Sequence, residues 1–452
     1  MIRNTKRIGF VSGLDNNKAI FVFVCILVIV LIVDTSIIKI YYFTINGAPL
    51  SWRVTLFIII TSIYIVGAYI IWQIVSRRSQ SIRSHGISFF NLLHKIAMVS
   101  QGLSIASILI VVLQILLNSS YSSMLLIIAT WISYSTGIIM LGVLAQKFLS
   151  WFRSERNYIV MLYAISSSML AVNATFIASL VTIDLMNVPT YIQPHITFGT
   201  PFSDFGLITT IVNYGFTISS ILSFILWWLS AAAIFKGYLK KSSKLYWIVF
   251  GLPLLYFLIQ FQPLFLNLFS SSLLSEPVLF STIYTIVFAL SKPVGGVLFG
   301  IAFWIITRKV GNKLSKTYLI SAAYGLVLVF VSNQADSLVT VPYPPFGLAT
   351  TSFMGISSYL LLIGVYSSAV CVAEDSKLRQ SIKILAVRES KFLHSIGIAQ
   401  MQNELQKRVM KIVEKEHSVL LEQTGVEPSL DGEDLKRYLN DTIEEIKKIS
   451  KK

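Results

Sequence analysis

The sequence predicts an all-α fold, a polytopic transmembrane helix bundle of about ten spans followed by a cytoplasmic helical tail. Apolar residues make up 55% of the 452 residues and charged residues only 13%, whereas a soluble domain carries about 25% charged residues. The charges gather towards the C-terminus, where residues 373–452 hold 15 of the 37 lysines and arginines. Long apolar segments separated by shorter polar ones fill the rest of the chain.

Ten apolar segments are long enough to cross a bilayer, because a transmembrane helix needs about 20 apolar residues and bonds its own backbone polar groups. The first has no small-residue cleavage site after it, so we expect a retained span and not a signal peptide. The ten expected spans are residues 19–42, 54–75, 96–117, 122–145, 158–183, 207–234, 246–269, 279–306, 317–334 and 347–372.

Basic residues alternate between the loops and so predict an orientation. The N-terminal segment and the loops after spans two, four, six and eight each carry several lysines or arginines, whereas the other loops carry none apart from Arg53. Loops rich in Lys and Arg stay on the cytoplasmic side. We therefore expect a multi-pass protein of the cell membrane with both termini in the cytoplasm. The net charge of +16 then reflects orientation and does not require a nucleic acid partner.

Two of the outward loops resemble each other. Residues 188–210 and 341–351 both begin with Val-Pro and end with Phe-Gly-Leu-x-Thr-Thr. The offset predicts that spans 3–6 recur as spans 7–10, a parallel four-helix repeat of the kind found in some transporters. Chance similarity between apolar helices is the other interpretation. The expected units are 1–95 with spans one and two, 96–235, 236–372 and the tail 373–452.

Charged residues inside a span are the default candidates for a functional site, because each costs about 2.5–3.5 kcal/mol at the bilayer centre. Lys292 lies near the middle of the expected span eight, and Pro293 after it predicts a kinked or broken helix. Asp34 in span one and Asp336 at the outer end of span nine are candidates for neutralising Lys292. These four residues form the expected ligand or ion pathway, and a structural pair inside the membrane is the alternative.

The sequence contains no motif that would identify an enzyme. A phosphate-binding loop, a nucleophile elbow and a zincin motif are all absent, so we expect no catalytic residue. The two cysteines and five histidines show no spacing typical of metal ligands, so we expect neither a metal nor a cofactor.

The tail contains a long amphipathic helix that we expect to continue directly out of span ten. Residues 374–422 have no proline, and their apolar positions recur at spacings of three, four and seven. Because an exposed apolar stripe needs a partner, we expect protein binding or self-association through residues 374–449. The bilayer surface and a second tail helix near residues 435–446 are the other candidates for covering this stripe. The stripe consists of Leu378, Ile382, Leu385, Phe392, Ile396, Leu405, Val409 and Ile412.

The segment Val341-Pro342-Tyr343-Pro344-Pro345-Phe346-Gly347, with Leu378-Arg379-Gln380-Ser381-Ile382 after span ten, is similar to uncharacterised multi-pass membrane proteins of ammonia-oxidising archaea. Some of those resemble the membrane-sensing part of signal-transduction proteins. The resemblance covers mainly residues 317–400, and it implies an archaeal source but no mechanism or functional residue.

Two functions remain open at this point. The first is a non-enzymatic sensor or membrane-complex subunit whose cytoplasmic tail binds a partner. The second is a secondary transporter or channel with a polar site at the broken eighth span. We favour the first, because polar residues inside the spans are sparse for a coupled transporter.

Overall fold

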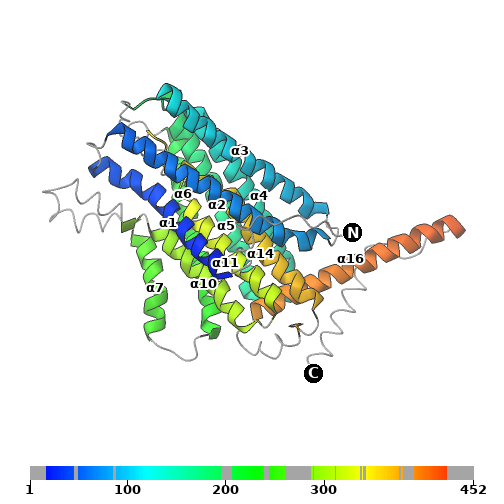
Figure 1. Cartoon of the computed structure of the whole chain (residues 1–452). Helices are drawn as coiled ribbons and strands as arrows, with labels where there is room; N and C mark the ends of the chain where they lie inside the picture. Colours follow the sequence, from blue (N-terminus) through cyan, green and yellow to red (C-terminus); the bar gives the residue numbers. More distant parts are fainter. Residues whose placement is uncertain are drawn as a thin grey trace.

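The computed structural model describes residues 17–44, 49–84, 88–194, 206–238, 244–259, 287–288, 290–310, 312–335, 338, 343–375, 378–379 and 391–424. Nearly all of these residues are helical, and the two short strands among them, β1 (Tyr121–Ser122) and β2 (Tyr191–Ile192), form one antiparallel pair. The predicted all-α fold is confirmed. Figure 1 shows the long helices side by side in one bundle, with α16 (Lys391–Thr424) projecting from one end.

Eight apolar segments of the described chain are long enough to cross a membrane, so the protein is an integral membrane protein. They coincide with eight of the ten expected spans. They lie in α1 (Asn17–Thr44), α2 (Leu50–Ser84), α3 (Ser88–Asn118), α4 (Ser123–Glu155), α5 (Tyr158–Met186), α6 (Leu207–Tyr238), α11 (Lys313–Ser332) and the consecutive helices α13 (Leu348–Thr351) and α14 (Met354–Glu374).

Spans seven and eight coincide only in part with described helices. These helices are α7 (Lys244–Ile259) and α10 (Ser291–Lys309), which pack against α6 and against each other. Most of the chain between them lies outside the described residues. The four-helix repeat and the division into units therefore stay predictions.

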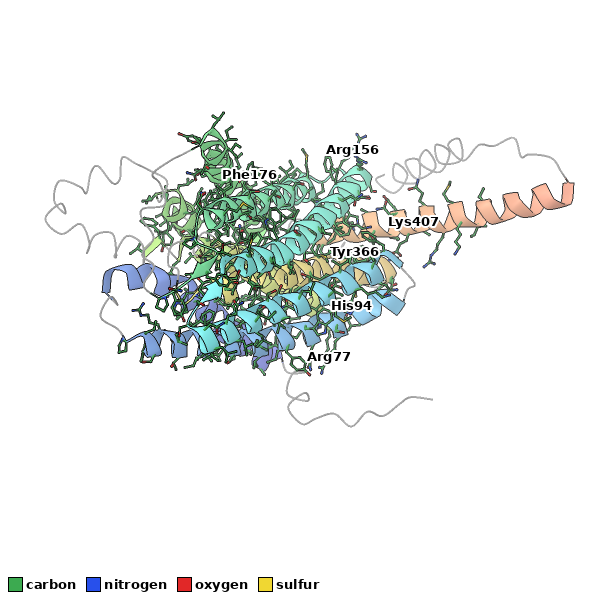
Figure 2. All side chains as sticks on the ribbon, turned by 90° about the horizontal axis from the view of Figure 1, so that it is seen from above. Arg77, His94, Arg156, Phe176, Tyr366 and Lys407 are labelled. Carbon is green, nitrogen blue, oxygen red and sulfur yellow. The ribbon has the colours of Figure 1, made fainter. Side chains whose placement is uncertain are left out.

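The two ends of the bundle differ in character. Figure 2 shows the basic residues Arg77, Arg156 and Lys407 at the end from which α16 projects, which we call the tail side. The opposite end, the loop side, contains the first residues of α4 and α6. Loop charge predicts that the tail side faces the cytoplasm.

α14 is the central helix of the bundle. Nearly every one of its residues is buried, because it packs against α2, α3, α4, α11 and α16. The helices around it expose large apolar side chains, including Val66 of α2, Leu109 of α3 and Ile128 of α4, and such exposed apolar surface is typical of a membrane-facing helix. The neighbouring helices thus shield α14 from lipid along its length.

The tail helix does not continue from span ten, contrary to the prediction. α14 ends at Glu374, and Asp375 has an extended backbone with φ −90° and ψ 101°. The Asp375 carboxyl accepts a hydrogen bond from the backbone N–H of Leu378 at 3.0 Å, the bond of a residue that caps a new helical turn. α16 then packs back against α14, α4 and α5. Periodicity predicted helical structure where α16 is found, but it carries no information about the break at Asp375 or the direction in which α16 leaves the bundle.

Candidate functional site

α11 and α14 have ends inside the bundle, beside the same turn of α4. The Ser133 hydroxyl donates to the carbonyl oxygen of Thr351 at 2.9 Å and accepts from the backbone N–H of Gly355 at 3.2 Å. The Tyr134 hydroxyl donates to the carbonyl oxygen of Ser332 at 3.2 Å. Ser133 is about 15 Å along the axis from the first residue of α4. Two helix ends therefore lie well inside the loop-side surface, an arrangement that builds binding sites in several transporter folds.

Residues 343–353, which we call the plug segment, lie between these helix ends and the loop side. All of them are buried. Phe346 packs edge-on against Phe57 of α2 with 5.8 Å between ring centroids, and Phe353 packs against Tyr64 of α2 at 5.2 Å. The segment contains the short helix α13 and, before it, non-helical backbone. Such backbone is tolerated at membrane depth where protein surrounds it, and the aromatic contacts contribute to that surrounding.

Asp34 of α1 anchors the plug segment. Its fully buried carboxyl accepts the backbone N–H of Gly347 at 2.9 Å, the backbone N–H of Thr350 at 3.0 Å and the Thr350 hydroxyl at 2.8 Å. Gly347 has φ 84°, a left-handed conformation that glycine adopts without steric cost. The Thr350 hydroxyl also lies 3.0 Å from the carbonyl oxygen of Leu31, so one proton serves two acceptors. Asp34 thus caps the first turn of α13.

A second group of polar side chains, the asparagine cluster, joins α5, α6, α10 and α11. Asn333 donates from Nδ2 to Oδ1 of Asn173 at 2.8 Å, and Asn173 donates from Nδ2 to the Ser219 hydroxyl at 3.1 Å. Lys292 donates from Nζ to the carbonyl oxygen of Asn333 at 3.2 Å, and its ammonium lies 5.2 Å from the ring centroid of Phe216. The lysine charge is thus held by a carbonyl dipole and an aromatic face.

The structure places Lys292 in the first turn of α10, with Pro293 beside it. A proline in the first turn interrupts no helical hydrogen bond, because the N–H groups there have no partner within the helix. The helix therefore begins close to the point where the sequence predicts a break. Asp336 lies outside the described residues, whereas Asp34 belongs to the cap of the plug segment.

A search restricted to charged residues does not identify Asn173 and Asn333. Both side chains are buried. A buried amide costs free energy unless it is hydrogen-bonded. An asparagine inside an apolar span is therefore the sequence signal that identifies Asn173. Oδ1 of Asn333 is buried and has no hydrogen-bond partner among the described residues. The cluster thus combines an ammonium, two carboxamides and a hydroxyl, which suit a small polar solute. No group of three or more His, Cys, Asp or Glu side chains in the described chain could hold a metal ion.

The first half of α16 docks on the tail side of the bundle. Trp151 of α4 donates from Nε1 to Oε1 of Gln400 at 3.0 Å, and Gln400 donates from Nε2 to the Tyr366 hydroxyl of α14 at 3.2 Å. Asn157 donates from Nδ2 to the Ser395 hydroxyl at 2.7 Å. These bonds connect α16 to two bundle helices and to the loop after α4.

The predicted apolar stripe divides into a docked part and a projecting part. The docked part is satisfied within the chain itself, because it covers the tail-side ends of α4, α5 and α14. Leu378, Phe392 and Ile396 are buried, Val409 is half-buried, Leu405 and Ile412 are exposed, and Ile382 and Leu385 lie outside the described residues.

Comparison of the chain with protein-family models, with curated proteins and with solved structures finds no match. The resemblance to archaeal membrane proteins therefore stays a prediction.

Proposed function

We propose that the protein is a non-enzymatic sensor or membrane-complex subunit of the cell membrane whose tail helix α16 binds a protein partner in the cytoplasm. One observation carries the proposal: the projecting half of α16 leaves Leu405, Ile412 and Val413 exposed by 51%, 60% and 37%. Figures 1 and 2 show this half extending beyond the other helices. Apolar side chains seven and eight positions apart form one face of a helix, as in helices that bind a groove or a second helix.

α14 supplies the connection between an outer signal and the tail. Its first residues contact Ser133 beside the plug segment, and its last turns contact α16 through Tyr366 and Val372. A ligand or partner that moves the plug segment shifts the loop-side end of this buried helix. In our proposal that shift alters the docking of α16 and so the presentation of its projecting half.

The test is co-purification in mild detergent of the full chain and of a Leu405→Ser/Ile412→Ser variant. We expect the variant to lose a protein that copurifies with the wild type, or to lose self-association measured by light scattering, because both changes remove apolar side chains from the projecting face. Arg408→Ser is the matched control, since Arg408 is exposed on the same part of α16. An identical set of bound proteins and an identical mass for all three chains would refute the proposal.

A secondary transporter or channel is the second candidate. It is favoured by Asn333 Oδ1, which has no hydrogen-bond partner in the described part of the chain, and by the helix ends that lie within the bundle. In this function the solute would bind at the asparagine cluster and exchange hydrogen bonds with Asn333 and Lys292. Proteoliposomes loaded with a chloride-sensitive dye test it for a small anion, the class of solute that the Lys292 ammonium attracts. Lys292→Met should abolish the flux, and flux that is unchanged in this variant would exclude the cluster as the pathway.

A further inference from the structure

A basic cleft lies between α1, α2 and α11 at the tail side. Its volume is about 550 Å³, and its walls include Arg77 and Arg78 from the end of α2 and Lys313 and Lys316 from the first turn of α11. None of the described residues that line it is acidic. Asp375, which bonds to Asn312 at the start of α11, is not part of the lining.

The two lysines occupy an unfavourable position for cations. The N-terminal end of a helix carries a partial positive charge, so acidic side chains are the favourable ones in its first turn. α11 has no acidic residue there, and its cap comes from Asn312, whose Oδ1 accepts the backbone N–H of Leu314 at 2.8 Å. Two lysines, two arginines and a helix N-terminus thus surround one cleft, and no acidic residue is among its described lining. A bound anion with two or more oxygens would accept hydrogen bonds from several of these groups at once.

The position of the cleft along the spans indicates which molecule would supply that anion. The apolar span of α2 ends at Ser79 and that of α11 begins at Lys313, so the cleft lies where two spans leave the hydrocarbon. Ile20 of α1 forms part of its wall, and the next residues of α1, Phe21 and Val22, are exposed and apolar. A headgroup in the cleft would thus have a neighbouring apolar surface for its acyl chains.

We propose that this cleft binds the phosphate headgroup of an anionic membrane lipid, with Arg77, Arg78, Lys313 and Lys316 as its cationic ligands. Arginine supplies paired N–H donors to phosphate oxygens, and lysine supplies a mobile point charge. Basic pockets between transmembrane helices on the cytoplasmic side are suited to such headgroups. The site is independent of whether α16 binds a partner.

The experiment uses the purified full-length protein in neutral detergent and follows its thermal unfolding midpoint. Three probes are added at equal concentrations: dioctanoyl phosphatidylglycerol, dioctanoyl phosphatidylcholine and inorganic phosphate. We expect a saturable rise of the midpoint with phosphatidylglycerol only, weakened by added salt because the interaction is electrostatic. A rise of equal size with phosphatidylcholine, or with inorganic phosphate alone, would overturn the assignment to an anionic lipid.

Paired substitutions locate the effect. Arg77→Gln/Lys316→Gln should require roughly 30-fold more phosphatidylglycerol for half of the effect, from the usual contribution of two basic residues near an anionic headgroup. Arg153→Gln/Lys236→Gln removes the same pair of residue types, also exposed and outside the cleft, and should behave as the wild type. The charge-conserving variant Arg77→Lys/Lys316→Arg should retain binding, which separates loss of charge from loss of fold. Equal responses of the neutral double variant and the wild type would overturn the proposal.

Discussion

Replacing Asp34 by alanine removes the carboxyl that caps α13 and holds the plug segment to α1. The backbone N–H groups of Gly347 and Thr350 then lose their acceptor while they remain buried. An unsatisfied buried donor costs about 1–3 kcal/mol, so two of them predict a loss of about 2–6 kcal/mol in the stability of the plug segment. The Thr350 hydroxyl retains the carbonyl oxygen of Leu31 as an acceptor and adds little to this cost.

Hydrogen–deuterium exchange of the detergent-solubilised protein measures this loss where it occurs. Peptides covering residues 343–353 should exchange faster in Asp34→Ala than in the wild type, because local opening exposes the two amides. Asp184→Ala, which removes a partly exposed carboxyl at the loop-side end of α5, is the control and should leave the plug segment protected. Unchanged exchange in the Asp34 variant would refute the capping role.

Three further predictions follow from the packing. Gly397→Leu should undock α16, because even a Cβ at this position overlaps Val372; trypsin should then cleave α16 faster, and an unchanged cleavage rate would contradict the docking. Asn173→Leu should lower the thermal unfolding midpoint by leaving a buried amide of the asparagine cluster unpaired, at a cost of about 1–3 kcal/mol, and an unchanged midpoint would show that the cluster is dispensable for stability. Burial, with the nearby Tyr343, raises the pKa of Tyr121 well above its ordinary value, so the contribution of Tyr121 to stability is complete below about pH 10 and is lost as pH rises further. Tyr121→Phe should flatten this alkaline fall in the midpoint, and a pH dependence equal to that of the wild type would assign the fall to other groups.

Hydropathy predicted most of the fold because a membrane restricts each span to one structure. An apolar run of about 20 residues has to bond its own backbone and so has to form a helix. α5 was expected at residues 158–183 and is found at Tyr158–Met186. The same reasoning did not predict that α11 and α14 have ends beside Ser133 and Tyr134. Backbone groups near these ends are hydrogen-bonded by side chains of α4, and hydropathy carries no information about such contacts.

The candidate site was predictable only in part. Lys292 is identified by its charge, but its bond to Asn333 and the bond from Asn333 to Asn173 join residues 41 and 160 positions apart. Asp34 was a candidate for neutralising Lys292, yet its carboxyl bonds to Gly347, 313 positions away. No periodic pattern in a sequence records such pairings, because they depend on which helix faces lie against each other.

Residue composition, the length of the apolar runs and the alternation of basic loops were sufficient to identify a multi-span helical protein and to predict its orientation. They were also sufficient to predict an amphipathic helix in the tail. The course of that helix, the capped plug segment and the basic cleft between α1, α2 and α11 arise from contacts between distant segments. The physical reason is that hydrophobic burial follows from local composition, whereas hydrogen bonds and charge clusters require particular atoms to meet within a few ångströms.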